Sequence, residues 1–207
     1  MDGYFDSIAD KWEQCPDKIN RARATADKIH ELAFDKAETI VDYGCGTGLL
    51  GLQLCSSFKH VTLVDASENM LKIVNRKLSD SEIKNADTQQ CTHLAELKGK
   101  YSIIVTSMTL HHVADVNAFF EQAFQCLSTQ GRLIVADLYL EDGSFHAHNP
   151  KFNGHNGFDP VALSKVAERI GFPDITIEPY YNIIQDKGDV KNATYPLFFF
   201  VAKKGRD

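Results

Sequence analysis

The fold is decided by the stretch Thr39-Ile40-Val41-Asp42-Tyr43-Gly44-Cys45-Gly46-Thr47-Gly48. Three β-branched residues precede an acid, which is typical of a buried strand that ends near Asp42. Glycines then occupy every second position, and glycine best tolerates the left-handed backbone of a tight turn. The apolar run 49–54 predicts a helix whose N-terminal N–H groups face that turn. The stretch therefore predicts a strand, a space for a ligand and the start of a helix.

Two acids define the kind of ligand that fits this space. Asp42 ends the first strand, and a carboxylate there is a poor neighbour for the pyrophosphate of a dinucleotide. A ligand with a cationic amino group suits it better. Asp65 ends the next predicted strand, 61–64, where one carboxylate can accept hydrogen bonds from the two hydroxyls of a ribose. Together the two acids predict an adenosine that carries an amino acid instead of phosphates.

The glycine turn and the strands after it resemble the class I S-adenosylmethionine-dependent methyltransferases, of the small-molecule type found in bacteria. Their fourth and fifth strands are matched by 101–107 and 131–137, with Leu110-His111-His112-Val113 between them. Their motif acid-x-G-x-G-x-G and their ribose-binding acid are matched by Asp42, Gly44, Gly46, Gly48 and Asp65.

The resemblance implies an α/β, Rossmann-like fold with a seven-stranded mixed sheet, an antiparallel last strand and helices on both faces. The apolar run 197–202 is expected to lie in that last strand, between strands five and six, buried on both faces. The resemblance also implies S-adenosylmethionine as cofactor, S-adenosylhomocysteine as product and an O, N or S nucleophile of a small molecule as acceptor. We expect 1–207 to form one methyltransferase domain, in which 1–34 is a helical lid and 139–158 is the substrate-side loop.

Composition agrees with one soluble domain. A chain of 207 residues with 43% hydrophobic content can bury one sizeable core. The net charge of -6 and the scattered lysines give no basic stripe, which argues against nucleic acid as a partner. The longest apolar run is too short to cross a bilayer, and five cysteines without a C-x-x-C pair fit a reducing compartment. We therefore expect a cytoplasmic protein that is not inserted in a membrane.

Two other functions are compatible with the sequence. The segment 46–51 satisfies G-x-G-x-x-G, and Asp65 follows at a suitable distance for a nicotinamide-dependent oxidoreductase, although the motif starts two residues late. A binding protein that keeps the cofactor site without methyl transfer is the second alternative, because the third strand lacks the acid that relatives use for the adenine amino group. Gln90, or Cys91 with Thr92, takes that place, and a glutamine carbonyl can accept the same hydrogen bond.

Further cofactor contacts follow from the resemblance. The apolar spacing at 5, 8, 9 and 12 predicts a short helix that is similar to the cofactor lid of relatives. Tyr4 and Trp12 are then either aromatic covers over the ligand or ordinary docking aromatics. The remaining candidates flank the adenine or the amino-acid end of the cofactor: Ala66, Met70, Ser107 and Met108.

Histidines near strand ends are the candidates for chemistry. His111 and His112 follow the fourth strand, either as a base or as a structural turn. The loop 139–158 is longer than a compact domain needs, and its three histidines suit a metal set, a base with orienting partners or a hydrophilic surface. We assign no metal ligands from the sequence, because the loop fixes no ligand geometry. The catalytic candidates are His155, His146 and His111, and the substrate candidates are Tyr139, His146, His148 and His155.

Overall fold

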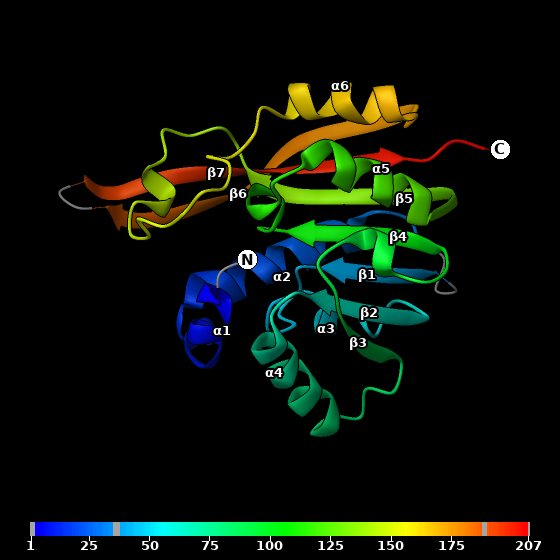
Figure 1. Cartoon of the computed structure of the whole chain (residues 1–207), viewed down its shortest axis with the longest axis horizontal. Helices are drawn as coiled ribbons and strands as arrows, with labels where there is room; N and C mark the ends of the chain where they lie inside the picture. Colours follow the sequence, from blue (N-terminus) through cyan, green and yellow to red (C-terminus); the bar gives the residue numbers. More distant parts are fainter. Residues whose placement is uncertain (1–2, 35–37, 188–189, 207) are drawn as a thin grey trace.

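The computed structural model describes residues 3–34, 38–187 and 190–206. A seven-stranded sheet runs through its centre in the order β3-β2-β1-β4-β5-β7-β6 (Figure 1). This order confirms the predicted mixed sheet, because β7 lies antiparallel between β5 and β6. The strands are β1 (Thr39–Tyr43), β2 (His60–Asp65), β3 (Ala86–Gln90), β4 (Tyr101–Ser107), β5 (Leu127–Leu138), β6 (Asp174–Lys187) and β7 (Val190–Lys203).

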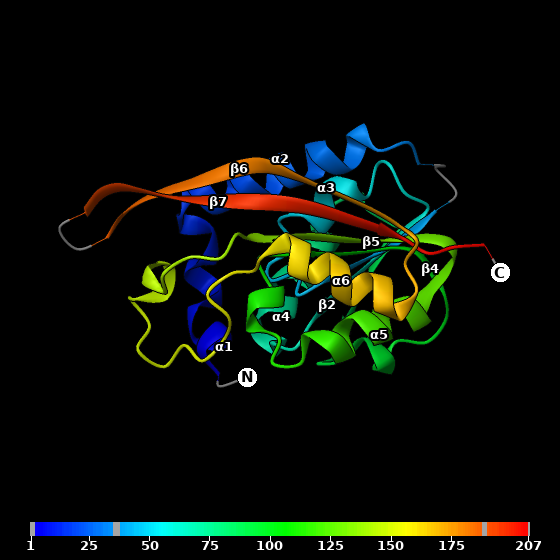
Figure 2. The ribbon, with the colours of Figure 1, turned by 90° about the horizontal axis from the view of Figure 1, so that it is seen from above.

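Helices cover both faces of the sheet, with α2 and α6 on opposite sides of it (Figure 2). Consecutive residues of one strand pack into hydrophobic cores on opposite faces of the sheet. Ile40 of β1 and Phe199 of β7 pack with α2, α3 and α4. Their neighbours Val41 and Phe200 pack with α5 and α6. Side chains of a strand alternate between faces, so the central strands carry apolar residues on both faces of the sheet. The helices are α2 (Pro16–Glu31), α3 (Gly51–Leu54), α4 (Glu68–Ser79), α5 (Val116–Cys126) and α6 (Pro160–Ile170).

The helix predicted over 49–54 is shorter than its apolar run suggests. The chain continues as a turn through Leu50, and α3 occupies only Gly51–Leu54. The Gly48 N–H donates to the Cys45 carbonyl (2.9 Å), which keeps the backbone curled back on the turn before α3 begins. The prediction of the helix start was wrong because hydrophobic periodicity does not distinguish a buried turn from a first helical turn.

The carboxyl ends of β1, β2 and β4 meet at one edge of the sheet. Two segments lie beyond that edge, to the left in Figure 1: α1 (Tyr4–Ile8) followed by η1 (Ala9–Gln14), and the loop between β5 and α6. The sheet thus places the glycine turn, the N-terminal segment and the histidine-bearing loop together. Among the described residues, no helix is both long and apolar enough to cross a bilayer.

The hairpin of β6 and β7 extends past the rest of the sheet at that edge (Figure 1). Leu138, Ile183, Tyr195 and Leu197 form a small apolar cluster at its base, and Phe145 of the loop packs against it. The loop is therefore packed against the base of the hairpin.

Candidate functional site

The glycine turn after β1 forms the floor of the site. Gly44, Gly46 and Gly48 all adopt positive φ angles, of 72°, 53° and 81°. A Cβ on Gly44 would lie 2.2 Å from Cγ2 of Thr109, so a side chain does not fit there without displacing that residue. Gly48 packs instead against Leu52 and lies outside the pocket lining. The turn is therefore shaped by backbone that only glycine adopts at low cost.

Asp65 ties the turn after β2 to the glycine turn. Its Oδ2 accepts from the Gly46 N–H (2.8 Å) and its Oδ1 accepts from the Ser67 N–H (2.8 Å). Burial raises the pKa of Asp65, and these N–H donors act in the opposite direction. A carboxylate oxygen has two acceptor sites, so both oxygens can still accept from a ligand. Asp65 also lines the pocket between the glycine turn and the N-terminal segment.

Asp42 is the buried acid of the site, with 1% of its surface exposed. Its Oδ2 accepts from the Gly51 N–H (2.9 Å), which is the first residue of α3. Burial raises the pKa of Asp42 to about 7, more than the Gly51 N–H lowers it, and the charge of Asp65 raises it further. A cationic neighbour would favour the ionised form of this carboxyl group.

A pocket opens between the glycine turn and the N-terminal segment, enclosing about 890 Å³ of space including its open mouth. The sequence missed part of the lining, including Phe5, Lys18, Arg21, Thr109 and His112. The aromatic pattern could have suggested Phe5, but no local pattern marks a cation of α2 as a pocket residue. The sequence-predicted residues that do line the pocket are Asp42, Gly44, Gly46, Asp65, Ala66, Met70, Cys91, Thr92, Ser107, Met108 and Trp12.

Two further cofactor candidates, Gln90 and Tyr4, do not reach the pocket lining. Gln90 Nε2 donates to the Ala66 carbonyl (3.0 Å), so this side chain holds the turn after β2 instead of facing the pocket. Tyr4 is 38% exposed and lies edge-on to Phe5, with ring centroids 5.4 Å apart. Phe5 takes the pocket position, because α1 begins at Tyr4 and directs the following residue inward.

The N-terminal segment is fastened over the turn by polar contacts at two points. Asp6 Oδ1 accepts from Ser67 Oγ (2.6 Å) and from the Asn69 N–H (3.1 Å), where it faces the positive end of α4. Glu13 Oε1 accepts from Thr47 Oγ1 (2.5 Å) and from Lys77 Nζ. Both contacts join the segment to elements that flank the pocket.

Trp12 is the aromatic side chain that this segment places over the glycine turn. Its Nε1 lies 3.6 Å from the position a Cβ on Gly46 would occupy, and Lys18 Nζ lies 3.2 Å from the centroid of the indole. Lys18 therefore covers one face of the ring, and the Nε1 edge of the ring lies beside the glycine turn. Tyr4, which starts the same segment, does not line the pocket.

We expect Trp12→Ala to weaken the affinity for S-adenosylhomocysteine about tenfold, the scale of a lost aromatic contact. Isothermal titration calorimetry measures this directly. Tyr4→Ala is the matched control, because it removes an aromatic residue of the same segment that lies outside the pocket, and its affinity should equal that of the parent protein. Equal losses in both variants would mean that the segment acts only by docking.

His111 is buried and fixed by a buried acid. Its Nδ1–H donates to Asp137 Oδ1 (2.6 Å), and its backbone N–H faces Asp137 Oδ2 (3.3 Å). Burial opposes ionisation of Asp137, but the contacts with His111 and the Leu138 N–H together hold its pKa below the usual value. The sequence placed His111 and Asp137 at the ends of adjacent strands, and the structure pairs them.

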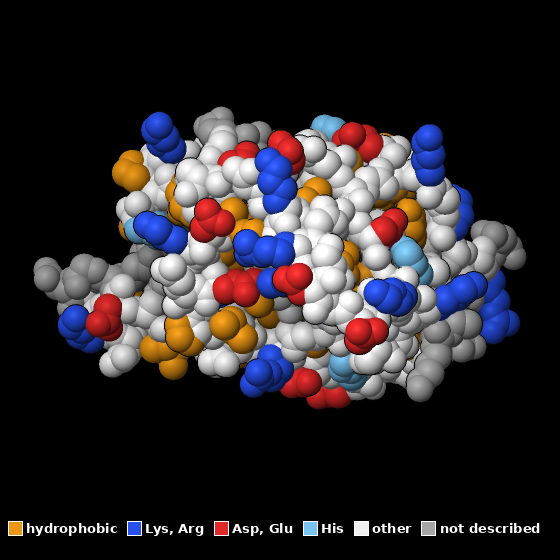
Figure 3. Space-filling view, turned by 90° about the horizontal axis from the view of Figure 1, so that it is seen from below, with side chains coloured by type: hydrophobic (Ala, Val, Ile, Leu, Met, Phe, Trp, Pro, Cys, Tyr) orange, Lys and Arg blue, Asp and Glu red, His pale blue; other side chains and the backbone are white. Residues whose placement is uncertain are grey.

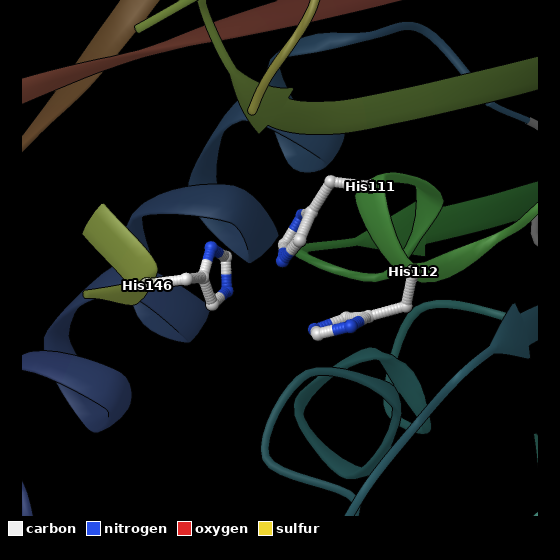
Figure 4. A group of neighbouring side chains, drawn as sticks. All are labelled: His111, His112 and His146. Atoms are coloured by element: carbon white, nitrogen blue, oxygen red, sulfur yellow. The ribbon is translucent and has the colours of Figure 1, made fainter. Parts of the chain in front are cut away.

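His112 and His146 lie beside His111 (Figure 4). The ring centroids of His111 are 4.2 Å from those of His112 and 5.0 Å from those of His146. His146 stacks on Phe152 with 3.7 Å between centroids and 6° between planes. Burial lowers the pKa of His112 to about 3, and the neighbouring imidazoles His111 and His146 lower it further. The His112 ring is therefore neutral at physiological pH.

Like His111 and His146, the other loop candidates lie outside the pocket lining. His155 donates its backbone N–H to the His111 carbonyl (2.7 Å) and its Nε2–H to the Val113 carbonyl (3.0 Å), so it supports the turn η3 (Leu110–His112). His148 is exposed, with its ring 6.2 Å from that of His146. Tyr139 lies edge-on to Phe198, 5.5 Å away, over the sheet. Of the loop residues proposed from the sequence, only His146 joins the histidine group.

Residues 18–177 match the family model described as a methyltransferase domain. That range contains the glycine turn, both acids and the histidine group. The chain belongs to the methyltransferase domain family. An uncharacterized methyltransferase of Schizosaccharomyces pombe is 29% identical over 143 residues, which cover 65% of this chain and 48% of that protein. This methyltransferase domain thus spans about half the length of that relative.

Solved structures share the fold of this methyltransferase domain. The YcgJ protein of Bacillus subtilis superposes with a TM-score of 0.73 at 14% identity, covering 89% of this chain and 99% of that one. Phosphoethanolamine N-methyltransferase 2 of Haemonchus contortus, in complex with S-adenosyl-L-methionine, also gives 0.73, at 16% identity, covering 98% of this chain and 60% of that one. The predicted class I methyltransferase fold is confirmed.

Proposed function

We propose that the protein binds S-adenosylmethionine in the pocket beneath Trp12 and transfers its methyl group to a small-molecule acceptor. The position of Asp65 carries this proposal. Its two oxygens are held by backbone N–H groups of both neighbouring turns and still have acceptor sites at the pocket wall. The family match supports methyl transfer over the dinucleotide alternative.

The residues of the pocket fit this cofactor along its length. Gly44 and Gly46 both line the pocket, where their backbone can approach a ligand closely because neither carries a side chain. Asp42 suits the cationic amino group of the methionine moiety, and Lys18 and Arg21 on α2 suit its carboxylate. The ribose then meets Asp65. The adenine is then contacted by the pocket residues that follow Asp65 along the wall: Ala66, Met70, Cys91 and Thr92.

The sulfonium of the cofactor supplies an already electrophilic methyl group, so the chain mainly aligns the acceptor and excludes water. The N-terminal segment up to residue 34 acts as the lid, and the loop 139–158 forms the acceptor side, which His112 and Met108 border from within the pocket. Met108 adopts a φ of 53°, an unusual backbone conformation for a side chain of this size. Such strain is concentrated at functional sites, in agreement with a role for Met108 at the reacting end.

Charge and cysteine chemistry support a small-molecule acceptor in the cytoplasm. The face on which α4 lies interleaves acidic and basic side chains and shows no basic stripe for a nucleic acid (Figure 3). The five cysteines are free, as expected in a reducing compartment.

The proposed function is tested by following S-adenosylhomocysteine formation with a panel of thiols, amines, phenols and carboxylates. We expect turnover with one acceptor class and none without acceptor, whereas Asp65→Ala loses turnover at low cofactor concentration. Calorimetric titration with NAD is the control for the oxidoreductase alternative. Tight binding of S-adenosylmethionine without turnover across the panel would favour the binding-protein alternative, and binding of NAD alone would reject the proposal.

A further inference from the structure

Three histidines from two separate segments converge beside the cofactor pocket. His111 and His112 lie in η3, and His146 lies in η4 (Ser144–His146) of the loop after β5. One nitrogen atom from each ring lies within 4.8 Å of those of the other two, and the rings surround a common space (Figure 4). We infer that these three side chains form a binding site for a divalent transition metal ion of the zinc type.

The chemistry of the donors matches such an ion. Zinc takes imidazole nitrogens at about 2.0–2.1 Å, so tetrahedral ligands lie about 3.4 Å apart and small ring rotations would close the site. All three side chains belong to a region buried from solvent, since His111 and His146 are buried and His112 is partly buried. Imidazole suits zinc, copper, iron and nickel, and it does not suit magnesium or calcium.

A buried carboxylate orients the ring of His111. The Nδ1–H of His111 donates to Asp137 Oδ1 (2.6 Å), which leaves the lone pair on Nε2. A carboxylate behind a histidine is the arrangement that fixes metal-ligating imidazoles in proteins. His155 adds two hydrogen bonds to carbonyls of the same turn, at His111 (2.7 Å) and Val113 (3.0 Å). The turn that presents two of the ligands is therefore held rigidly.

The third ligand is held just as firmly by the loop. The start and the end of the loop are joined by the hydrogen bond from the Leu140 N–H to the Phe158 carbonyl (2.8 Å). Next to His146, Ser144 Oγ contacts the Tyr195 hydroxyl of the hairpin (2.7 Å). Phe152 stacks on His146 and lies edge-on to His112, 5.4 Å away. The three rings are thus enclosed by an aromatic wall on the side of the loop.

The position of the group indicates its role, which rests on the proposed function. Three protein ligands leave one coordination position open, as in catalytic zinc sites, and His112 also lines the cofactor pocket. A thiol or hydroxyl acceptor would bind there as its anion and release its proton to solvent. Its lone pair then forms the bond to the methyl carbon, while the bond from that carbon to the sulfonium breaks and returns its electron pair to the sulfur.

The test is a calorimetric titration of the metal-free full chain with Zn²⁺, in a Cys15→Ser background because the Cys15 thiol is exposed. We expect one bound equivalent. His146→Phe keeps the stack on Phe152 and removes the ring nitrogens, so its zinc affinity should fall at least 100-fold. His30→Ala, which removes an exposed histidine on α2, should bind zinc like the parent. Co²⁺ should give the visible spectrum of a tetrahedral site in the parent and not in His146→Phe.

Unchanged zinc affinity in His146→Phe, or the absence of zinc binding by the parent, would overturn the inference. Circular dichroism verifies the fold of each variant, and His112→Ala replaces His146→Phe if the latter is unfolded. A titration of the same samples with S-adenosylhomocysteine separates this inference from the proposed function. Zinc binding without cofactor binding would reject only the function, and cofactor binding without zinc would reject only the metal site.

Discussion

Asp65→Ala should weaken the binding of S-adenosylhomocysteine by about 2 to 3 kcal/mol, or roughly 30- to 150-fold. The variant removes the acceptor of two ribose hydroxyls, and hydrogen bonds to a charged group are the strong kind. It also removes the acceptor of the Gly46 and Ser67 N–H groups, so some loss of folding stability accompanies it. Calorimetry measures the affinity, and chemical unfolding measures the stability separately.

Two variants isolate the role of Asp65 as a ligand contact. Asp65→Asn keeps one acceptor oxygen for the turn and should retain more stability than Asp65→Ala. Asp87→Ala is the matched control for charge, because it removes a carboxylate that pairs with His60 (2.9 Å) on the surface and does not line the pocket. A parental dissociation constant in Asp65→Ala would remove this residue from the ribose role.

Asp42→Asn should stabilise the cofactor-free protein and at the same time weaken the binding of the cofactor. The pKa of Asp42 is raised to about 7 in the fold, against about 3.9 in the unfolded chain. Between these values the native state binds more protons at Asp42 than the unfolded state, so the contribution of Asp42 to stability is fully present below pH 4 and is lost as pH rises through 7. Asparagine has no charge to lose and still offers an oxygen to the Gly51 N–H.

The size of this effect follows from linkage. A raised pKa costs about 1.4 kcal/mol per unit, so Asp42→Asn should gain about 2 to 4 kcal/mol at pH 8 and little at pH 4, measured by chemical unfolding without cofactor. In the parent, the affinity for S-adenosylmethionine should rise from pH 6 to pH 8, because its amino group binds the ionised carboxylate. The variant should show a flat and weaker profile. A stability gain that is independent of pH would contradict the raised pKa.

The sequence predicted the elements that depend on short-range patterns. Alternating glycines after a β-branched run fix a turn within ten residues, and acids at two strand ends define the ligand edge without knowledge of distant contacts. The apolar run 197–202 predicted a strand buried on both faces, and it lies in β7 between β5 and β6. Such features follow from the sequence because neighbouring residues impose them through backbone sterics and side-chain periodicity.

The prediction of site residues was weaker where a shift of one residue along a helix or strand decides which side chain faces the pocket. Phe5 lines the pocket and Tyr4 does not, although both belong to the same aromatic helix. Gln90 donates to a backbone carbonyl instead of facing the ligand, because β3 ends with its side chain over the adjoining turn. Periodicity identifies the buried face of a segment, whereas the neighbour that each side chain meets depends on how the segment docks.

What only the tertiary structure decided is the grouping of the histidines. His146 meets His111 and His112 because the hairpin of β6 and β7 and the turn η3 hold the loop after β5 from two sides. His148 and His155 belong to the same loop, but His148 is exposed and His155 bonds to the Val113 carbonyl. A loop without periodicity does not encode the direction of its side chains locally, so the packing of distant elements determines which of them can share a ligand.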